Sequence, residues 1–492
     1  MISANLIING REETSDRTID VVSPADIRVL LGSVPDAAPG QVDEAVAAAA
    51  MAFPEWSSRP LEERQGALLA AAGTIHDMIE EYAPILSREN GKILEESHVD
   101  LEFASGICGY TAGISAEILA DQQIRDTGGG TTLIRRRPMG GPVAAITPWN
   151  FPVVLAFMKL APALVAGNTV VLKPAASSPL VLAEIIRALQ QHFPPGVLNM
   201  VTGGDAVGEA LVAHPSIRKI GFTGGIDTGR KVMAAAARDI KRVTLELGGN
   251  DPPAILLDDV DLSPETMRQI VKKGAFGTTG QVCFGLKRIY VPTRIHDRFV
   301  EAFSAAVDEI VVGPGDDPRV TMGGPLNNAQ QKNLVEKIVD DARSSGATVT
   351  TLGQRLDSAA WDHGHFMMPS VVTEADPRLA IVEEEQFGPV VPVLKYDELD
   401  DVIRLVNQSQ YGLAASIWTS DEERAFLLGR RFDTGSVFIN SHTFTSLDPP
   451  AHPSAGAKAS GLGREFSPAS LDSYTELQTI SRRIGPPGPP LS

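Results

Sequence analysis

Short apolar segments alternate with helical segments through the middle of the chain. The apolar runs have strand-like composition, and between them apolar residues recur at helical spacing. The expected strands are residues 143–147, 169–173, 197–201, 219–223 and 242–247, and the expected helices are residues 152–166, 179–191, 206–213 and 228–237. This alternation is typical of a parallel sheet covered on both faces, whose ligands bind beyond the carboxyl ends of the strands. Four loops are therefore candidates for chemistry, those after Thr147, Lys173, Thr223 and Leu247.

A second series of the same kind begins near Pro253. Its expected strands are residues 253–258, 288–292, 390–396, 412–419 and 436–440, with helices between them. Two helical stretches with alanine-rich faces, residues 41–56 and 61–92, precede both series. We therefore expect two α/β domains. The length of 492 residues agrees with this, because single cores tend to stop growing beyond ~250–300 residues.

Two further strand-like segments stand apart from both series. Residues 131–138 (TTLIRRRP) follow the flexible sequence TGGG, and residues 474–483 (YTELQTISRR) alternate near the end of the chain. Because neither has a partner strand in its own domain, we expect both to pair with another subunit. The Pro/Gly-rich residues 485–492 are expected to be a disordered tail.

Composition narrows the class of protein. Hydrophobic residues make up 43% and charged residues 21% of the chain, and the formal net charge of −18 argues against a nucleic-acid partner. The first residues lack a basic stretch followed by an apolar one, and no apolar run approaches the ~18 residues of a membrane span. Two cysteines and nine scattered histidines give neither a disulfide framework nor metal-ligand spacing. We expect a cytoplasmic protein without a membrane anchor or a metal site.

Cys283 is the strongest candidate for a nucleophile. It lies in the sequence TTGQVCFG, where Gly280 and Gly285 allow the backbone to turn and to approach a ligand closely. A free cysteine is more often a small buried apolar residue, and Cys108, in the helical sequence SGICGYTAG, has that interpretation. This segment alone leaves both interpretations of Cys283 open.

Two of the candidate loops carry polar side chains suited to acyl chemistry. Glu246 ends the strand in TLELGGN, where burial would raise its pKa toward that of a base that activates water. Asn150, in TPWNFP, offers an amide N–H to a developing oxyanion. A solvated glutamate and a turn-forming asparagine are the alternatives.

A Gly-rich turn offers a place for a dinucleotide, although the sequence G-x-G-x-x-G is absent. The segment FTGGIDTGRK, residues 222–231, joins a strand to a helix whose first N–H groups can hold a pyrophosphate. Lys173 can donate to ribose hydroxyls or be merely solvated. In EEEQFGPV, Glu385 can bind a ribose and Phe387 can flank a nicotinamide ring.

Taken together, these segments resemble the aldehyde dehydrogenase superfamily, from about Ile7 to Ile480. The motifs occur in the family's order: PWNFP, LKPA, GFTGG, LELGG, GQVC, FGPV, FIN and SGLGRE. The resemblance implies an α/β fold with a Rossmann-like cofactor domain, an α/β catalytic domain and a β oligomerisation arm. The implied boundaries are residues 1–118 and 140–248 for the cofactor domain, 249–450 for the catalytic domain, and 119–139 and 468–484 for the arm.

The resemblance also implies roles for individual residues. Cys283 is expected to be the nucleophile, Asn150 and the Cys283 backbone N–H the oxyanion donors, and Glu246 the base for the hydrolytic water. The expected cofactor residues are Lys173 at the adenosine ribose, Glu385 at the nicotinamide ribose, Phe387 beside the nicotinamide, Thr223, Gly224 and Gly225 beside the phosphates, and Trp149 at the adenine side. The product would be a carboxylic acid, with NAD or NADP as cofactor and a homodimer or homotetramer as the assembly.

Two regions suggest cofactor and substrate preference. Ala176 stands where NAD-selective relatives carry a glutamate, which favours acceptance of both NAD⁺ and NADP⁺. An uncharged aliphatic or aromatic aldehyde is expected, with Lys159 and Lys287 facing away from the substrate tunnel. The expected tunnel is apolar and consists of Phe151, Leu155, Met158, Val282 and Phe284. Two alternatives remain: release of the acyl group by coenzyme A, which Glu246 argues against, and a non-catalytic binding protein that retains the fold.

Overall fold

The alternation of apolar strands and helices after residue 142 folds as a parallel sheet. In the computed structural model, which describes residues 2–125, 130–250, 253–356, 361–442, 453 and 456–482, this sheet has eight strands in the order β22-β12-β11-β8-β9-β10-β2-β3. Its parallel centre consists of β8 (Val143–Ile146), β9 (Val170–Lys173), β10 (Leu198–Met200), β11 (Lys219–Gly224) and β12 (Arg242–Leu247). The five strands predicted from the sequence are thus confirmed.

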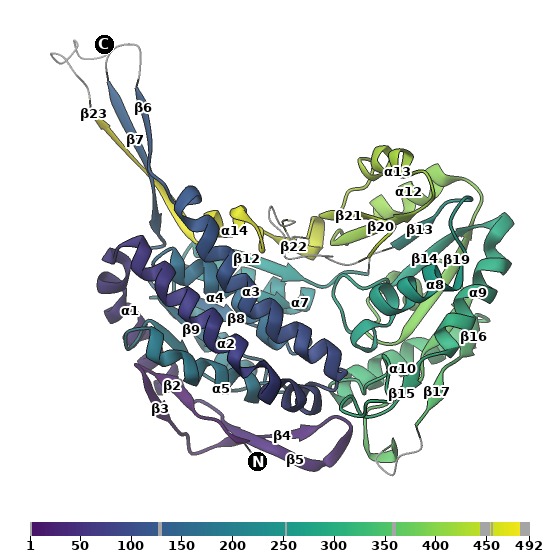
Figure 1. The fold of residues 1–492 in the computed structure, drawn as a ribbon, viewed down its shortest axis with the longest axis horizontal. Coiled ribbons are helices and arrows are strands. Elements are labelled where there is room, and N and C mark those ends of the chain that lie inside the picture. Colours follow the sequence, from purple (N-terminus) through teal and green to yellow (C-terminus); the bar gives the residue numbers. More distant parts are fainter. Residues whose placement is uncertain are drawn as a thin grey trace.

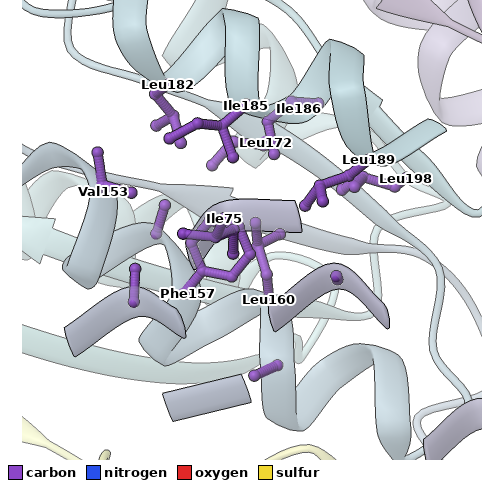
Figure 2. Packing of buried hydrophobic residues seen from close by; sticks show 14 of the residues in the cluster. Ile75, Val153, Phe157, Leu160, Leu172, Leu182, Ile185, Ile186, Leu189 and Leu198 are labelled. Atoms are coloured by element: carbon purple, nitrogen blue, oxygen red, sulfur yellow. The ribbon is translucent and has the colours of Figure 1, made fainter. Parts of the chain in front are cut away.

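Helices cover both faces of this sheet. On one face lie α2 (Leu61–Asn90), α3 (Leu94–Ile118), α4 (Pro152–Val165) and α5 (Leu180–Leu189), and on the other α1 (Pro39–Ser58), α6 (Asp205–Ala213) and α7 (Ile226–Ala237). Successive residues of a strand point to opposite faces, so Leu172 packs with the first group and Val171 with the second. Figure 2 shows Leu172 among the side chains of α2, α4 and α5. Burial on both faces explains why the strands read as continuous apolar runs.

Short strands at the edges of this body were not predicted. β2 (Leu6–Ile8), β3 (Arg11–Glu13) and β22 (Gly461–Leu462) extend the large sheet in antiparallel pairings. A separate small sheet contains β1 (Ile2–Ser3), β4 (Thr18–Ser23) and β5 (Asp26–Pro35). Strands of two or three residues are too short to show an alternating pattern, which accounts for β1, β2, β3 and β22. β4 and β5 are longer, and the sequence analysis missed them.

The second series forms a seven-stranded sheet in the order β16-β18-β19-β14-β13-β20-β21, parallel except for β16. Its strands are β13 (Pro253–Leu256), β14 (Arg288–Pro292), β16 (Thr348–Thr351), β18 (Ser370–Thr373), β19 (Val390–Tyr396), β20 (Ala414–Trp418) and β21 (Ser436–Ile439). The helices around it are α8 (Pro264–Gln269), α9 (His296–Asp308), α10 (Ala329–Ser344), α11 (Ala380–Glu383), α12 (Leu399–Gln408) and α13 (Glu422–Gly429). Two short strands, β15 (Val311–Val312) and β17 (Gln354–Arg355), form a separate pair. Figure 1 shows the two α/β bodies side by side.

A narrow arm projects from the first body (Figure 1). It consists of β6 (Gln122–Arg125), β7 (Thr131–Pro138) and β23 (Thr475–Arg482), which follows α14 (Pro468–Ser473). Contrary to the expectation that neither segment has a partner strand in its own domain, β7 and β23 pair with each other along their whole length, from Thr475 opposite Pro138 to Arg482 opposite Thr131. Pairing with another subunit stays a prediction. Sequence spacing gave no sign of this pairing, because the two strands are far apart along the chain.

The α/β class with two parallel sheets is confirmed, whereas the residue boundaries of the domains stay predictions. Residues 485–492, expected to be a disordered tail, lie outside the described residues. Within the described part of the chain, none of the helices combines the length and the apolar character that a membrane crossing requires.

Candidate active site

The loops at the carboxyl edge of the eight-stranded sheet face the loops that precede β14 and β19. A cavity of ≈ 410 Å³ lies between the two sets of loops. Most of the residues predicted from the sequence line it: Trp149, Asn150, Phe151, Leu155, Met158, Thr223, Gly224, Gly225, Glu246, Cys283, Phe284, Glu385 and Phe387. Lys173, Ala176 and Val282 do not.

Cys283 stands in a tight turn shortly before β14. The amide N–H of Gly285 donates to the carbonyl of Val282 at 3.0 Å, so Cys283 and Phe284 are the two central residues of the turn. These two central residues line the cavity. Val282, expected in the tunnel, begins the turn and is not among the residues that line the cavity.

The approach to this turn has unusual backbone geometry. Thr278 and Thr279 have φ angles of 49° and 56°, and Gly280 has a φ of +73°. A Cβ atom on Gly280 would lie 2.2 Å from the carbonyl oxygen of Gly388. Glycine at position 280 therefore lets the cysteine loop pack directly against the segment that carries Glu385 and Phe387.

The thiol of Cys283 lies in a setting that favours its protonated form. Burial, followed by the negative charges of Glu385 and Glu246, raises the pKa of the thiol to about 12, and Lys287 opposes this shift. The nucleophile of the free protein is therefore mostly a thiol at neutral pH, and a nearby base has to accept its proton. The other cysteine, Cys108, is fully buried in α3, where burial also raises its pKa, as expected for a structural residue.

Asn150 links the first sheet to the cysteine loop. It lies between β8 and α4, is 3% exposed, and its Nδ2 donates to the carbonyl oxygen of Gln281 at 3.0 Å. Its second amide hydrogen is free for another acceptor, since an NH₂ group carries two donors. Gln281 is held in turn, because its Oε1 accepts from the amide N–H of Asn327 at 3.0 Å. Asn150 is thus a fixed donor beside the nucleophile.

Glu246 reaches the cavity from β12, between Thr223 of β11 and Gly461 of β22. The residue is 8% exposed, and its Oε1 has no hydrogen-bond partner among the described residues. Burial and the nearby carboxylate of Glu465 raise the pKa of Glu246 well above its usual value, against the opposing charge of Lys159. A carboxylate with a raised pKa and a free oxygen is suited to take a proton from water.

The charge beside Glu246 comes from a residue that the sequence analysis quoted without a role. Glu465 ends the motif SGLGRE, lines the cavity, and contacts Lys159 Nζ at 3.0 Å. Lys159 Nζ also donates to Thr223 Oγ1 at 2.6 Å. Neither Lys159 nor Lys287 is among the residues that line the cavity, in keeping with the expected orientation.

Glu385 and Phe387 lie on the opposite wall, before β19. Glu385 Oε1 accepts from the amide N–H of Gly249 at 3.3 Å, and burial raises the pKa of Glu385 to about 7. A Cβ atom on Gly248 would lie 2.1 Å from Glu385 Oε2, so the carboxylate is seated against bare backbone. The ring of Phe387 meets that of Trp149 edge to face, with centroids 5.5 Å apart. Trp149, expected at the adenine side, therefore lies beside the residue expected at the nicotinamide.

Lys173, the last residue of β9, and Ala176 in the loop after it lie farther along the same edge. Burial lowers the pKa of Lys173, and its Nζ donates to the carbonyl of Pro174 at 3.2 Å, the one acceptor found for it among the described residues. Two of its three donors thus remain available for ribose hydroxyls. Gly225 is the N-cap of α7, whose first N–H groups face the same edge. With Glu385, these residues fit a dinucleotide that extends from the cysteine to β9.

The remaining wall of the cavity is apolar. Phe151, Leu155, Met158 and Phe284 line it as predicted. The structure adds residues that sequence reasoning missed, namely Val99, Phe103 and Ile107 of α3, Val154 of α4, and Phe466. Asp100 also lines the cavity, but its charge is matched by Lys92 at 2.9 Å. No lysine or arginine lines the cavity in the part of the chain that the structure describes.

Comparison with known proteins agrees with this site. The sequence model of the aldehyde dehydrogenase family matches residues 11–480. Geranial dehydrogenase from Castellaniella defragrans is 35% identical over 462 residues, which cover 93% of this chain and 94% of that protein.

Two solved structures with bound cofactors are similar over almost their whole length. Betaine aldehyde dehydrogenase from Staphylococcus aureus in complex with NAD⁺ has a TM-score of 0.92 and 32% identity, covering 99% of this chain and 96% of that one. NADP-dependent glyceraldehyde-3-phosphate dehydrogenase from Bacillus halodurans, complexed with NADP, has a TM-score of 0.90 and 33% identity, covering 99% and 100%. The family and the cofactor class predicted from the sequence are confirmed. The chain belongs to the aldehyde dehydrogenase family, and the protein is an NAD(P)-dependent oxidoreductase that oxidises aldehydes.

Proposed function

We propose that the protein converts an uncharged aldehyde to a carboxylic acid through a thioester on Cys283. The observation that carries this proposal is the meeting of three groups in one cavity: the Cys283 thiol, the Asn150 amide and the unpartnered Glu246 carboxyl oxygen. They come from three segments, residues 148–151, β12 and the turn before β14. A fold retained only for binding would have no need of a buried carboxyl oxygen without a partner.

Each residue has a defined task in this mechanism. Cys283 loses its proton to a nearby carboxylate and attacks the aldehyde carbon, and the free N–H of Asn150 and the Cys283 backbone N–H donate to the resulting oxyanion. A nicotinamide bound against Glu385 and Phe387 supplies the hydride acceptor. The backbone carbonyl of Gln281 accepts from Asn150 Nδ2 and keeps this oxyanion donor in place during the reaction.

Water, rather than coenzyme A, is the proposed acceptor of the acyl group. Glu246 lines the cavity that contains Cys283, and its Oε1 is buried without a hydrogen-bond partner among the described residues. An oxygen in this position can hold a water molecule and accept its proton as the water attacks the thioester. A coenzyme A-dependent enzyme would have no use for a base of this kind.

The proposed substrate carries no charge at the end away from the aldehyde. The described walls of the cavity contain aromatic and aliphatic side chains but no cation, so a carboxylate or phosphate would lose its hydration without a partner. The phosphate-bearing substrate named for the glyceraldehyde-3-phosphate dehydrogenase therefore does not transfer to this chain. Hexanal or benzaldehyde should have a much higher kcat/KM than succinic semialdehyde; the reverse preference would overturn this proposal.

One assay separates the proposed activity from its two alternatives. Reduced cofactor is followed by absorbance with hexanal and either NAD⁺ or NADP⁺, with and without coenzyme A, and the product is identified. Formation of hexanoic acid without coenzyme A supports the hydrolytic mechanism. A strict need for coenzyme A, or cofactor binding without turnover, supports an alternative.

We further propose a homo-oligomer in the cytoplasm. The arm of β6, β7 and β23 projects from the body and exposes Ile124, Leu477 and Ile480, which is typical of a surface that a second copy covers. Both cysteines are free, which fits a reducing compartment. Light scattering after gel filtration should give a dimer or tetramer; a monomeric mass would contradict this assembly.

A further inference from the structure

His442 holds the turn that carries the nucleophile. It follows β21 in the second sheet, is 1% exposed, and places its Nε2 2.5 Å from the carbonyl oxygen of Phe284. A carbonyl oxygen only accepts hydrogen bonds, so Nε2 carries the hydrogen. The other ring nitrogen, Nδ1, is buried and has no partner among the described residues. The one N–H of the neutral ring therefore donates to the carbonyl of Phe284, the residue next to Cys283.

The hydrogen bond from His442 reaches the turn at the residue next to the nucleophile. Phe284 is a central residue of that turn, directly after Cys283, and its backbone lowers the pKa of the Cys283 thiol through a hydrogen bond, against the larger effect of burial. The next anchor is the amide N–H of Leu286, which donates to the carbonyl of Gly274 at 2.8 Å. Loss of His442 would remove the hydrogen bond that the Phe284 carbonyl accepts between these two points.

The ring of His442 is itself held in place. The ring of Phe438 meets it edge to face at 5.5 Å, and a Cβ atom on Gly274 would lie 3.6 Å from His442 Cβ. Burial and the positive charge of Lys287 lower the pKa of His442 to about 4. The imidazole is thus neutral and keeps the same N–H donor at neutral and alkaline pH. The charges of Glu385, Glu246 and Lys287, which act on the Cys283 thiol, therefore change nothing in this hydrogen bond by protonating the ring.

We propose that His442 is a positioning residue that fixes the Phe284 backbone and thereby the turn that presents the Cys283 thiol. The proposal deepens the proposed function and rests on Cys283 as the nucleophile. It assigns a role in the reaction to a residue that follows the last strand of the seven-stranded sheet and lies outside the motifs quoted from the sequence.

The test compares two substitutions that differ only in reach. The amide nitrogen of glutamine overlies the Nε2 position of histidine, whereas that of asparagine overlies Nδ1. His442→Gln therefore keeps the donor to Phe284, and His442→Asn removes it while leaving a polar group of similar size. The readout is the second-order rate constant for alkylation of Cys283 by iodoacetamide from neutral to alkaline pH, followed on the Cys283 peptide by mass spectrometry. Thermal unfolding and the Kd for NAD⁺ are measured on the same samples.

We expect the Asn variant to react about tenfold more slowly at each pH, and the Gln variant to stay within about threefold of the parent. Both should bind NAD⁺ with the parent's Kd, because the change is confined to the thiol. Equal alkylation rates for a folded Asn variant and the parent would overturn the proposal, as would equal losses in both variants. Alkylation needs no turnover, so this result is independent of whether Cys283→Ala abolishes aldehyde oxidation.

Discussion

The two parallel sheets contribute opposite edges to the same cavity. The eight-stranded sheet presents its carboxyl edge, with Asn150 after β8, Thr223 at the end of β11 and Glu246 near the end of β12. The seven-stranded sheet presents the segments that precede its strands, with Cys283 before β14 and Glu385 before β19. The first arrangement is usual for ligand sites in α/β sheets, and the second is its reverse.

Backbone strain largely follows the same division, with Phe466, a cavity residue that follows β22 and has a φ of 52°, as the exception. Thr278, Thr279 and Phe387, on the seven-stranded side, have positive φ angles. Among the described residues other than glycine, none in the loops directly after β8, β9 and β11 does. Residues at strand ends are positioned by the sheet itself, whereas the nucleophile is positioned by strained turns that neighbouring segments have to hold. The side that carries the covalent chemistry should therefore be the more sensitive one.

The largest effect is expected on the seven-stranded side, from removal of the Cys283 thiol. Cys283→Ala should reduce aldehyde oxidation by at least about ten-thousandfold, because no other group forms the covalent intermediate. Cofactor binding should persist, since the residues of the eight-stranded edge are untouched. Cys108→Ala is the matched control and should keep nearly the parent's kcat. Steady-state kinetics and cofactor titration decide; turnover by Cys283→Ala within tenfold of the parent would refute the assignment.

On the eight-stranded edge, the largest expected effect is limited to one step of the reaction, hydrolysis of the thioester. Glu246→Gln should slow hydrolysis of the thioester by about a thousandfold while formation of reduced cofactor in the first turnover is much less affected. Stopped-flow measurements should then show a burst of reduced cofactor. Equal losses in burst and steady state would place Glu246 earlier in the reaction, as the base for Cys283.

Two glycine substitutions sharpen the contrast in strain. Gly280→Ala places a Cβ at a φ of +73° and 2.2 Å from a backbone oxygen, and it should reduce kcat by about a hundredfold and stability by about 2 kcal/mol. Gly225→Ala, whose Cβ meets nothing within 4 Å, should leave stability almost unchanged and raise KM for the cofactor. Chemical denaturation and kinetics test both; similar stability losses would argue against a strained nucleophile side.

The smallest expected effect concerns cofactor choice at the eight-stranded edge. The parent should use both NAD⁺ and NADP⁺, because Ala176 is half-buried after β9 and presents no charge. Ala176→Glu should lower kcat/KM for NADP⁺ by about tenfold and leave NAD⁺ use nearly intact, because its carboxylate repels a 2′-phosphate. Ala176→Gln, of equal size without the charge, is the control. A parent that already rejects NADP⁺ by a thousandfold would contradict this prediction.

The sequence predicts the site residues of the eight-stranded edge by a general rule, but not those of the seven-stranded edge. The general rule for parallel sheets leads to the loops after Thr147, Thr223 and Leu247, and therefore to Asn150 and Glu246. No such rule leads to Cys283 or Glu385, which precede their strands; a Gly-rich segment and the family resemblance identify them. The positions of the strands could be predicted because both faces of each sheet are buried and the apolar runs are continuous.

Other parts of the site depend on contacts between distant segments. Phe103 and Ile107 line the cavity from α3, whose sequence mixes small and polar residues and showed no clear apolar face. The pairing of β7 with β23 joins residues more than three hundred positions apart. The contact of His442 with Phe284 likewise exists only in the folded chain. Local patterns do not report on pairings of this kind.

The central claim is that the acyl group is carried on Cys283 before water releases it. The most direct test is to mix Glu246→Gln with hexanal and NAD⁺, quench in acid during the burst, and locate any added mass by peptide mass spectrometry. We predict a hexanoyl group on Cys283 that hydroxylamine removes, in an amount that matches the burst of reduced cofactor. A burst of reduced cofactor with Cys283 unmodified, or with the acyl group on another residue, would contradict the account.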